Sequence, residues 1–190
     1  MINGIWLLFL GACGDDAATA PLPSRVQSIA QDPKQHENPE AFCDSWTESA
    51  ASRRFPRPAL AEGAWSNAPT WRWVNVWATW CGPCIAEMPT LVKWQEKLKE
   101  QGLPVDLVFL SVDKGQAEVD HFYARHPTLP PSKRIADVSA LPGWLGELGL
   151  DAGTAIPIHL FVDREDRLRC VRTGSLGDHH QASVRGVLSR

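Results

Sequence analysis

Two apolar runs separated by an amphipathic stretch dominate the middle of the chain. Residues 71–77 (WRWVNVW) and 105–112 (VDLVFLSV) are rich in β-branched and aromatic side chains, which is typical of buried strands. Between the two runs, from Cys84 to Leu98, apolar residues recur at helical spacing. Gly102 then follows as a helix stop. The pattern predicts a strand, a helix and a second strand.

The rest of the chain continues this alternation of elements. After the second strand we predict a helix that Asp113 caps and that ends before Pro127, followed by a proline-bearing connection over 128–137. A helix over 138–148, interrupted near Pro142, comes next. The chain then forms a hairpin of 158–162 and 168–172 and a closing helix over 179–188. Strands alternating with helices indicate the α/β class, with parallel pairing of the first two strands.

The candidate chemistry lies where the first strand gives way to the helix, in Trp80-Cys81-Gly82-Pro83-Cys84. Cys81 is expected at the helix N-terminus, where unpaired N–H groups and the positive end of the helix dipole stabilise a thiolate. Cys84, one turn later, should be more buried. Such a dithiol can attack a partner's disulfide through one sulfur and resolve the mixed disulfide through the other. We therefore predict a redox disulfide, with Cys81 as nucleophile and Cys84 as resolver.

Other uses of the same two cysteines fit the sequence less well. A zinc site needs a second pair of ligands, but Cys43 and Cys170 stand alone. A c-type haem needs His directly after the second cysteine, where Ile85 stands. An inert structural disulfide stays open as an alternative. We predict no metal and no cofactor.

The segment 74–89 (VNVWATWCGPCIAEMP) resembles the active site of the thioredoxin superfamily, and most of all its TlpA/ResA-like branch of membrane-anchored thiol-disulfide oxidoreductases. Asn75, Glu87 and Pro89 match that branch, and 155–163 (AIPIHLFVD) resembles its cis-proline loop and the strand that follows. The resemblance implies a thioredoxin-like fold with a central mixed sheet of four to five strands flanked by helices. It also implies an insertion between the second strand and the cis-proline loop.

The resemblance further implies roles for individual residues. Glu87 would be a partly desolvated carboxyl that relays the proton of Cys84, the alternative being an exposed first-turn acid that favours the helix dipole. Pro157 would present backbone groups beside the attacking sulfur. The residues implied in partner binding are Trp80, Gly82, Pro83 and Ile156. The family often has Thr after its proline, whereas Ile158 and His159 follow here. We interpret His159 as a packed strand residue.

The start of the chain predicts an exported protein. Residues 5–10 (IWLLFL) lead into Leu10-Gly11-Ala12-Cys13, which resembles a bacterial lipoprotein signal with Cys13 as the lipidated residue. One departure is that the first basic residue is Arg25. The run is too short to span a membrane, and an apolar N-terminus packed into the fold is the alternative. Residues 1–13 are thus the predicted signal, 14–40 a flexible tether, and 41–190 a thioredoxin-like domain with an N-terminal extension.

Cysteine usage and composition refine this prediction. After lipidation of Cys13 and pairing of Cys81 with Cys84, only Cys43 and Cys170 remain, as a structural disulfide or as two separate thiols. The 190 residues are 44% hydrophobic, enough for one domain of ordinary size. The net charge of −3 gives no reason to expect a nucleic-acid partner.

We therefore predict an enzyme, a lipid-anchored thiol-disulfide oxidoreductase on the periplasmic face of a bacterial membrane. Its partners would be exported disulfide or dithiol proteins, including those of cytochrome c or metalloprotein maturation, and a membrane electron donor. Gly82-Pro83 adds no cation that would stabilise the Cys81 thiolate, which favours a reductant. The alternatives are a thiol peroxidase and a non-catalytic binding or chaperone module that uses the same apolar groove.

Overall fold

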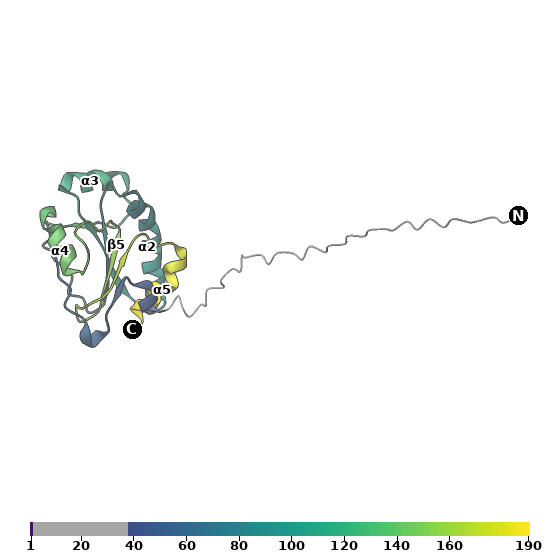
Figure 1. The fold of residues 1–190 in the computed structure, drawn as a ribbon. Helices are drawn as coiled ribbons and strands as arrows, with labels where there is room; N and C mark the ends of the chain where they lie inside the picture. Colours follow the sequence, from purple (N-terminus) through teal and green to yellow (C-terminus); the bar gives the residue numbers. More distant parts are fainter. Residues whose placement is uncertain (2–37) are drawn as a thin grey trace. The chain divides into compact units, whose positions relative to one another are not determined.

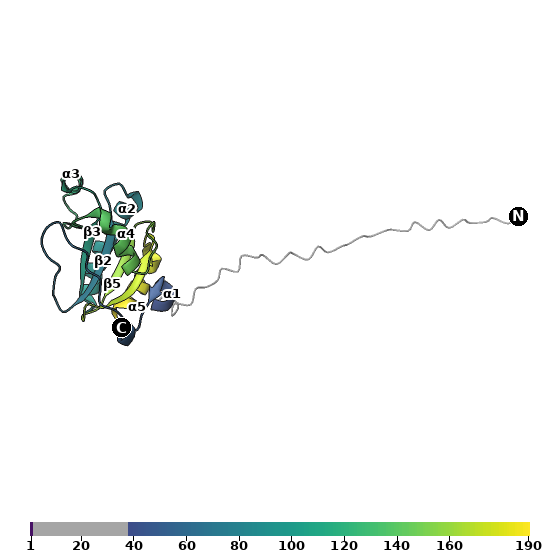
Figure 2. The same cartoon turned by 60° about the vertical axis from the view of Figure 1, so that its left-hand side comes forward.

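The computed structural model describes Met1 and residues 38–190 (Figures 1 and 2). The predicted signal, Cys13 and all but the last few residues of the predicted tether lie outside the described residues. Within the described part of the chain, no helix has the length and apolar character needed to cross a membrane.

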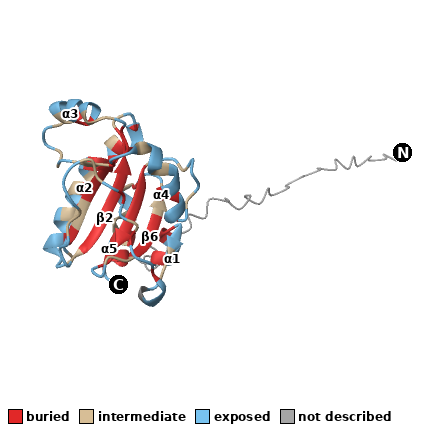
Figure 3. Ribbon diagram, turned by 90° about the vertical axis from the view of Figure 1, so that its left-hand side faces the viewer, coloured by how far each residue is buried: buried red, intermediate tan, exposed pale blue. Residues whose placement is uncertain are grey.

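A mixed sheet forms the centre of the domain. Its strands are β1 (Ser45–Trp46), β2 (Trp71–Trp77), β3 (Val105–Ser111), β4 (Lys133–Arg134), β5 (Ile158–Val162) and β6 (Leu168–Thr173), in the order β1-β6-β5-β2-β3-β4. The central strand β2 runs parallel to β3 and antiparallel to β5. Every residue of β2 and β5 is buried, and Figure 3 shows the buried positions concentrated in the strands. The predicted α/β class with a mixed sheet is confirmed.

The sheet has six strands among the described residues, whereas the prediction was four to five. The difference lies in β1 and β4 at its two edges. β1 pairs antiparallel with β6, and β4 pairs parallel with β3. Each is two residues long, too short to show a two-residue alternation, and β4 lies inside the stretch that we predicted as a connection.

Helices cover both faces of the sheet. They are α1 (Pro39–Phe42), α2 (Gly82–Glu100), α3 (Gln116–Arg125), α4 (Leu141–Glu147) and α5 (Gln181–Leu188). In Figure 1, α2 and α5 lie on one side of β5 and α4 lies on the other. Trp94 of α2 stacks on Trp73 of β2, which in turn stacks on Phe161 of β5. These large aromatic contacts hold α2, and with it the cysteine pair, against the central strands.

Three predicted helix starts need correction. α3 begins after Gly115, because the Asp113 side chain is engaged elsewhere. A short 3₁₀ turn covers Val138–Ala140, and α4 begins at Leu141. Pro142 thus lies in the first turn of a helix, where proline is tolerated, and does not interrupt one. The closing helix likewise follows a 3₁₀ turn over Asp178–His180. That the region between β3 and Pro157 is a family insertion stays a prediction.

The N-terminal extension packs against the last strand of the sheet. Besides the pairing of β1 with β6, a disulfide joins Cys43 to Cys170 across 127 residues of sequence. Both cysteines are buried, and the neighbouring Phe42 packs edge-on against Phe161. The extension is therefore attached to the domain by strand pairing, apolar contacts and a covalent bond.

Candidate active site

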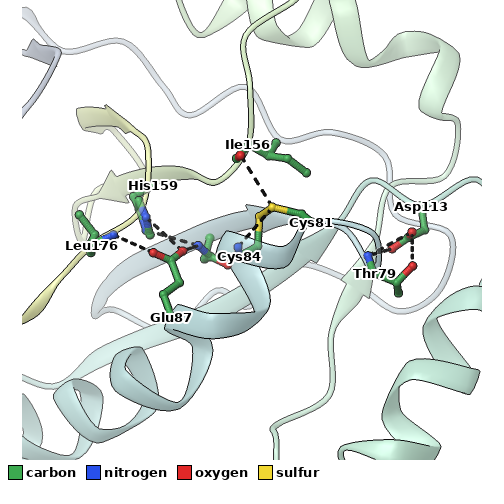
Figure 4. The surroundings of a disulfide bond; sticks show 9 residues. Thr79, Cys81, Cys84, Glu87, Asp113, Ile156, His159 and Leu176 are labelled. Atoms are coloured by element: carbon green, nitrogen blue, oxygen red, sulfur yellow. Dashed lines mark hydrogen bonds and ion pairs between the residues drawn. A yellow bond between two sulfur atoms is a disulfide. The ribbon is translucent and has the colours of Figure 1, made fainter.

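The two cysteines of the CGPC motif form a disulfide at the N-terminus of α2 (Figure 4). Cys81 is the N-cap residue, and the backbone N–H of Cys84 lies 3.3 Å from the Cys81 sulfur. Gly82 and Pro83 occupy the first turn between them, where proline fits because its missing N–H has no helical partner. When the disulfide is reduced, the Cys84 N–H and the positive end of the helix dipole both favour a thiolate on Cys81.

The cis-proline loop faces the same sulfur. The Ile156–Pro157 peptide is cis, and the Ile156 carbonyl oxygen lies 3.7 Å from the Cys81 sulfur (Figure 4). The Pro157 carbonyl accepts a hydrogen bond from the Gly174 N–H, which ties the loop to the end of β6. The loop thus brings backbone groups beside the Cys81 sulfur.

The burial of the two cysteines differs less than expected. Cys84 is 0% exposed and Cys81 only 5%, so Cys81 is the more accessible but is not an exposed residue. Cys81 is the N-cap residue of α2, and the Ile156 carbonyl lies against its sulfur. The exposed apolar surface beside the disulfide comes instead from Trp80, which is 71% exposed. The implied partner-binding residues Gly82 and Pro83 are exposed as well, and Ile156 is half-buried.

Glu87 lies one turn after Cys84 and is buried, 5% exposed. The alternative of a solvated first-turn acid therefore does not apply. Its Oε1 accepts a hydrogen bond from the Asn75 side-chain amide at 2.9 Å, and its Oε2 accepts one from the Leu176 N–H at 2.8 Å. The carboxyl is thus fixed between α2, β2 and the segment that follows β6, within the interior beneath the disulfide.

Asp113 is a site residue whose role the sequence reasoning missed. Its carboxylate accepts hydrogen bonds from the Thr79 N–H at 3.0 Å and the Thr79 hydroxyl at 2.8 Å (Figure 4). It also accepts one from the Ser111 hydroxyl at 2.7 Å. These contacts hold the turn that leads from β2 into Trp80 and Cys81. The available signal was position, since Asp113 follows the carboxyl end of β3, next to the end of the parallel strand β2.

His159 was expected to be a packed strand residue, and it is fully buried in β5. Its position next to Glu87 was not expected. The Nε2 atom of His159 lies 3.4 Å from Glu87 Oε1, and its Nδ1 atom lies 3.2 Å from the Trp73 indole nitrogen. The cross-strand pairing of Asn75 with His159 creates this neighbourhood, and that pairing could not be read from the sequence.

No metal site is evident in the part of the chain that the structure describes, since no three His, Cys, Asp or Glu side chains there are grouped to hold an ion. His179 and His180 lie side by side with ring centroids 3.8 Å apart. The Gly177 N–H donates a hydrogen bond to His180 Nδ1, so the His180 ring accepts from the backbone of its own turn. Burial lowers the pKa of His180, and electrostatic interaction with His179, Arg172 and His159 lowers it further.

Comparison with known proteins identifies families and structures that this chain resembles. The sequence model of the Redoxin family matches residues 72–188. Over 49 residues the chain is 45% identical to the thiol-disulfide oxidoreductase ResA of Oceanobacillus iheyensis; this match covers 26% of the chain and 24% of ResA. The chain therefore aligns with only about a quarter of that relative's length.

Solved structures extend the comparison to most of the domain. A thiol:disulfide interchange protein DsbE described as putative, from Chlorobium tepidum, superimposes with a TM-score of 0.56 at 18% identity, over 76% of this chain and 98% of that one. A thioredoxin-related protein from Neisseria meningitidis serogroup B gives a TM-score of 0.51 at 28% identity, over 63% and 86%. These structural likenesses confirm the thioredoxin-like fold, and the match to ResA confirms the resemblance to the TlpA/ResA-like branch. With its matched residues spanning more than half of its length, the chain belongs to the Redoxin family.

Proposed function

We propose that this protein is a thiol-disulfide oxidoreductase that reduces disulfides in other exported proteins. The observation that carries the proposal is the Cys81–Cys84 disulfide at a helix N-terminus, with an N–H aimed at the Cys81 sulfur and the exposed Trp80 beside it. A low-pKa sulfur, a second sulfur within reach and an apolar docking surface are what disulfide exchange requires.

The reaction proceeds from the reduced dithiol in two displacements. The Cys81 thiolate attacks one sulfur of the substrate disulfide, forms a mixed disulfide and releases the other substrate sulfur as a thiolate. Cys84, deprotonated, then attacks the Cys81 sulfur, which breaks the mixed disulfide and releases the second substrate thiolate. Two electrons pass from the dithiol to the substrate, and the protein is left with its Cys81–Cys84 disulfide. A dithiol donor must then restore the reduced state, and we propose a membrane protein for this step.

We assign two further parts of the site to this reaction. The Ile156 carbonyl and the cis-proline loop provide an edge along which an extended substrate segment pairs with the backbone. Glu87 accepts the proton of the Cys84 thiol before the second displacement, since it follows Cys84 by one turn and is shielded from bulk water. Trp80, Gly82 and Pro83 form the exposed rim that contacts the substrate.

We further propose that the protein works in the bacterial cell envelope, anchored through a lipidated Cys13. The Leu10-Gly11-Ala12-Cys13 sequence supports the anchor. A disulfide between Cys43 and Cys170 supports an oxidising compartment. Exported substrates in that compartment include apoproteins that need free thiols to receive haem or metal, and we propose these as the substrate class. Metabolic labelling with a fatty acid should mark the wild type and leave Cys13→Ser unlabelled; equal labelling would contradict anchoring.

The direct test of exchange is to trap the mixed disulfide. The Cys84→Ala variant, reduced and then mixed with an oxidised protein substrate, should accumulate a covalent adduct on Cys81 that intact mass and peptide mapping identify. The Cys81→Ala variant is the matched control and should form none. A Cys84→Ala protein that forms no adduct, or biological activity that survives in Cys81→Ala, would point to a binding module instead.

A further inference from the structure

A buried polar cluster lies directly beneath the redox disulfide. It consists of Trp73 and Asn75 from β2, Glu87 from α2 and His159 from β5, and we call it the His159 cluster. All four side chains are at most 5% exposed. Figure 4 shows the Glu87 carboxyl directed toward His159 and the Leu176 N–H. A buried histidine in contact with the proposed proton acceptor is the titratable group that the proposed reaction leaves unexplained.

The hydrogen-bond partners of His159 determine where its proton resides. The Trp73 indole nitrogen can only donate, and it lies 3.2 Å from His159 Nδ1. The side-chain NH₂ group of Asn75 is also a donor and lies 3.4 Å from the same atom. Nδ1 is therefore the acceptor and carries no proton. The proton of the neutral ring must then be on Nε2, which faces Glu87 Oε1 at 3.4 Å.

Several charged or titratable groups lie around His159 on the neighbouring elements. Glu87 on α2 is 3.4 Å from Nε2, Arg172 on β6 pairs opposite His159 and is itself ion-paired with Asp44, and His180 lies close enough to interact electrostatically. With two N–H donors at Nδ1, a ring proton on Nε2 toward Glu87 is the arrangement that fits these neighbours.

We propose that His159 is a positioning residue, an imidazole fixed by Trp73 and Asn75 that points its Nε2–H at the Glu87 carboxylate. Asn75 and Leu176 donate hydrogen bonds to that carboxylate, whereas Nε2, at 3.4 Å, makes an electrostatic contact and has no hydrogen-bond partner of its own. These three contacts hold the carboxylate in one orientation beside the Cys84 helix turn.

The tautomer can be tested without any assay of activity. In the intact protein labelled with ¹⁵N-histidine, long-range ¹H–¹⁵N spectra at about pH 8 should show one ring with its proton on Nε2. That signal should vanish in His159→Gln, which assigns it. In Trp73→Phe, which keeps the aromatic ring and removes the donor, the preference for a proton on Nε2 should weaken. A wild-type His159 that is protonated on Nδ1 overturns the proposal.

The positioning role requires a kinetic test, and this part rests on the proposed function. The reduced protein in excess over 5,5′-dithiobis(2-nitrobenzoate) releases one chromophore when Cys81 attacks and a second when Cys84 resolves the mixed disulfide. His159→Leu should leave the first release unchanged, slow the second by about tenfold and shift its pH profile. His159→Gln retains a donor that can reach Glu87 and should restore most of the rate. In Glu87→Gln, adding His159→Leu should have no further effect.

The two failures are distinguishable. A second release in His159→Leu with the wild-type rate and pH profile overturns the positioning role while exchange itself stands. A wild-type protein that releases no chromophore overturns the proposed function, and the spectra still decide the tautomer of His159.

Discussion

The described residues contain two disulfides that are the same bond in different surroundings. Cys81–Cys84 spans three residues at a helix start, with the exposed Trp80 beside it and the buried carboxyl of Glu87 one turn below. Cys43–Cys170 spans 127 residues and joins the N-terminal extension to the interior strand β6. The Cys81–Cys84 disulfide has the Cys84 N–H, the Ile156 carbonyl and the buried Glu87 carboxyl around it, whereas Cys43–Cys170 lies in the apolar core with side chains such as Phe42. The cysteines themselves are buried to a similar degree, since Cys43 is 8% and Cys81 5% exposed. Polar neighbours and the adjoining exposed Trp80, more than the bond or its burial, distinguish the first disulfide from the second.

The largest expected effect is the loss of exchange when the reactive pair is broken. Cys81→Ser should lower the rate of disulfide reduction by about 10³-fold or more, because no other sulfur in the site is placed to attack. Its melting temperature should fall by only a few degrees, since a three-residue loop contributes about 1.5 kcal/mol in the chain-entropy model. The measurement is insulin reduction followed by turbidity, with Cys84→Ser as the control that still forms a mixed disulfide.

Breaking the other pair should reverse this outcome. The double variant Cys43→Ala/Cys170→Ala releases a loop of 127 residues and should lose about 5 kcal/mol of unfolding free energy in the chain-entropy model. Its rate of exchange at a temperature where it is folded should equal that of the wild type. Urea unfolding and the insulin assay on the same samples test both halves. If exchange fell in proportion to stability, the two disulfides would not be functionally separate.

A smaller effect on the rate of exchange is expected from Asp113, which holds the turn before Cys81 from outside α2. Asp113→Ala removes the acceptor of three hydrogen bonds from Thr79 and Ser111 and should cost about 2 kcal/mol of unfolding free energy. Because these contacts orient the turn before Cys81, the first displacement should slow severalfold. The control is Asp137→Ala, which removes an aspartate that accepts a hydrogen bond from the Ser139 N–H on the exposed turn before α4. This variant should leave the rate unchanged. Equal rates in both variants would contradict the positioning of Cys81 by Asp113.

The smallest effect concerns the neighbour of the structural disulfide. Burial alone would raise the pKa of Asp44, but hydrogen bonds from Thr173 and the charge of Arg172 lower it below 3.8. A carboxyl whose pKa is lower in the folded state contributes stability above its unfolded pKa and loses it as the pH falls through the folded value. Asp44→Asn should therefore cost about 0.5–1 kcal/mol at pH 7, a figure reduced by solvent exposure. The difference between the two proteins should shrink below about pH 4 in urea unfolding, and a constant difference would contradict the assignment.

Local patterns in the sequence predicted much of this fold. The strand, dithiol and helix around Cys81 are visible because their periodicity and the cysteine spacing are properties of neighbouring residues. The hairpin of β5 and β6 is visible for the same reason. The two-residue edge strands are not, since β1 and β4 owe their existence to the partners that they meet and have too few residues for a pattern.

Contacts between distant residues limited the prediction of the site. Glu87 could be proposed because it shares a helix with Cys84. His159, in contrast, reaches Glu87 only through the register that places Asn75 opposite it, 84 residues away. Asp113 was assigned to a helix cap because that local use was the one visible in the sequence. Long-range register decides which polar side chains share the interior, and one sequence does not specify it.

The most direct test of the central claim is to measure the reduction potentials of both disulfides in one sample. The protein is equilibrated in thiol–disulfide buffers of graded potential, free thiols are alkylated, and each cysteine pair is quantified by peptide mass. We predict a midpoint near −270 mV for Cys81 and Cys84, with Cys43 and Cys170 still oxidised below about −300 mV. Reduction of both pairs at one potential, or a Cys81–Cys84 pair that stays oxidised throughout, would contradict the account.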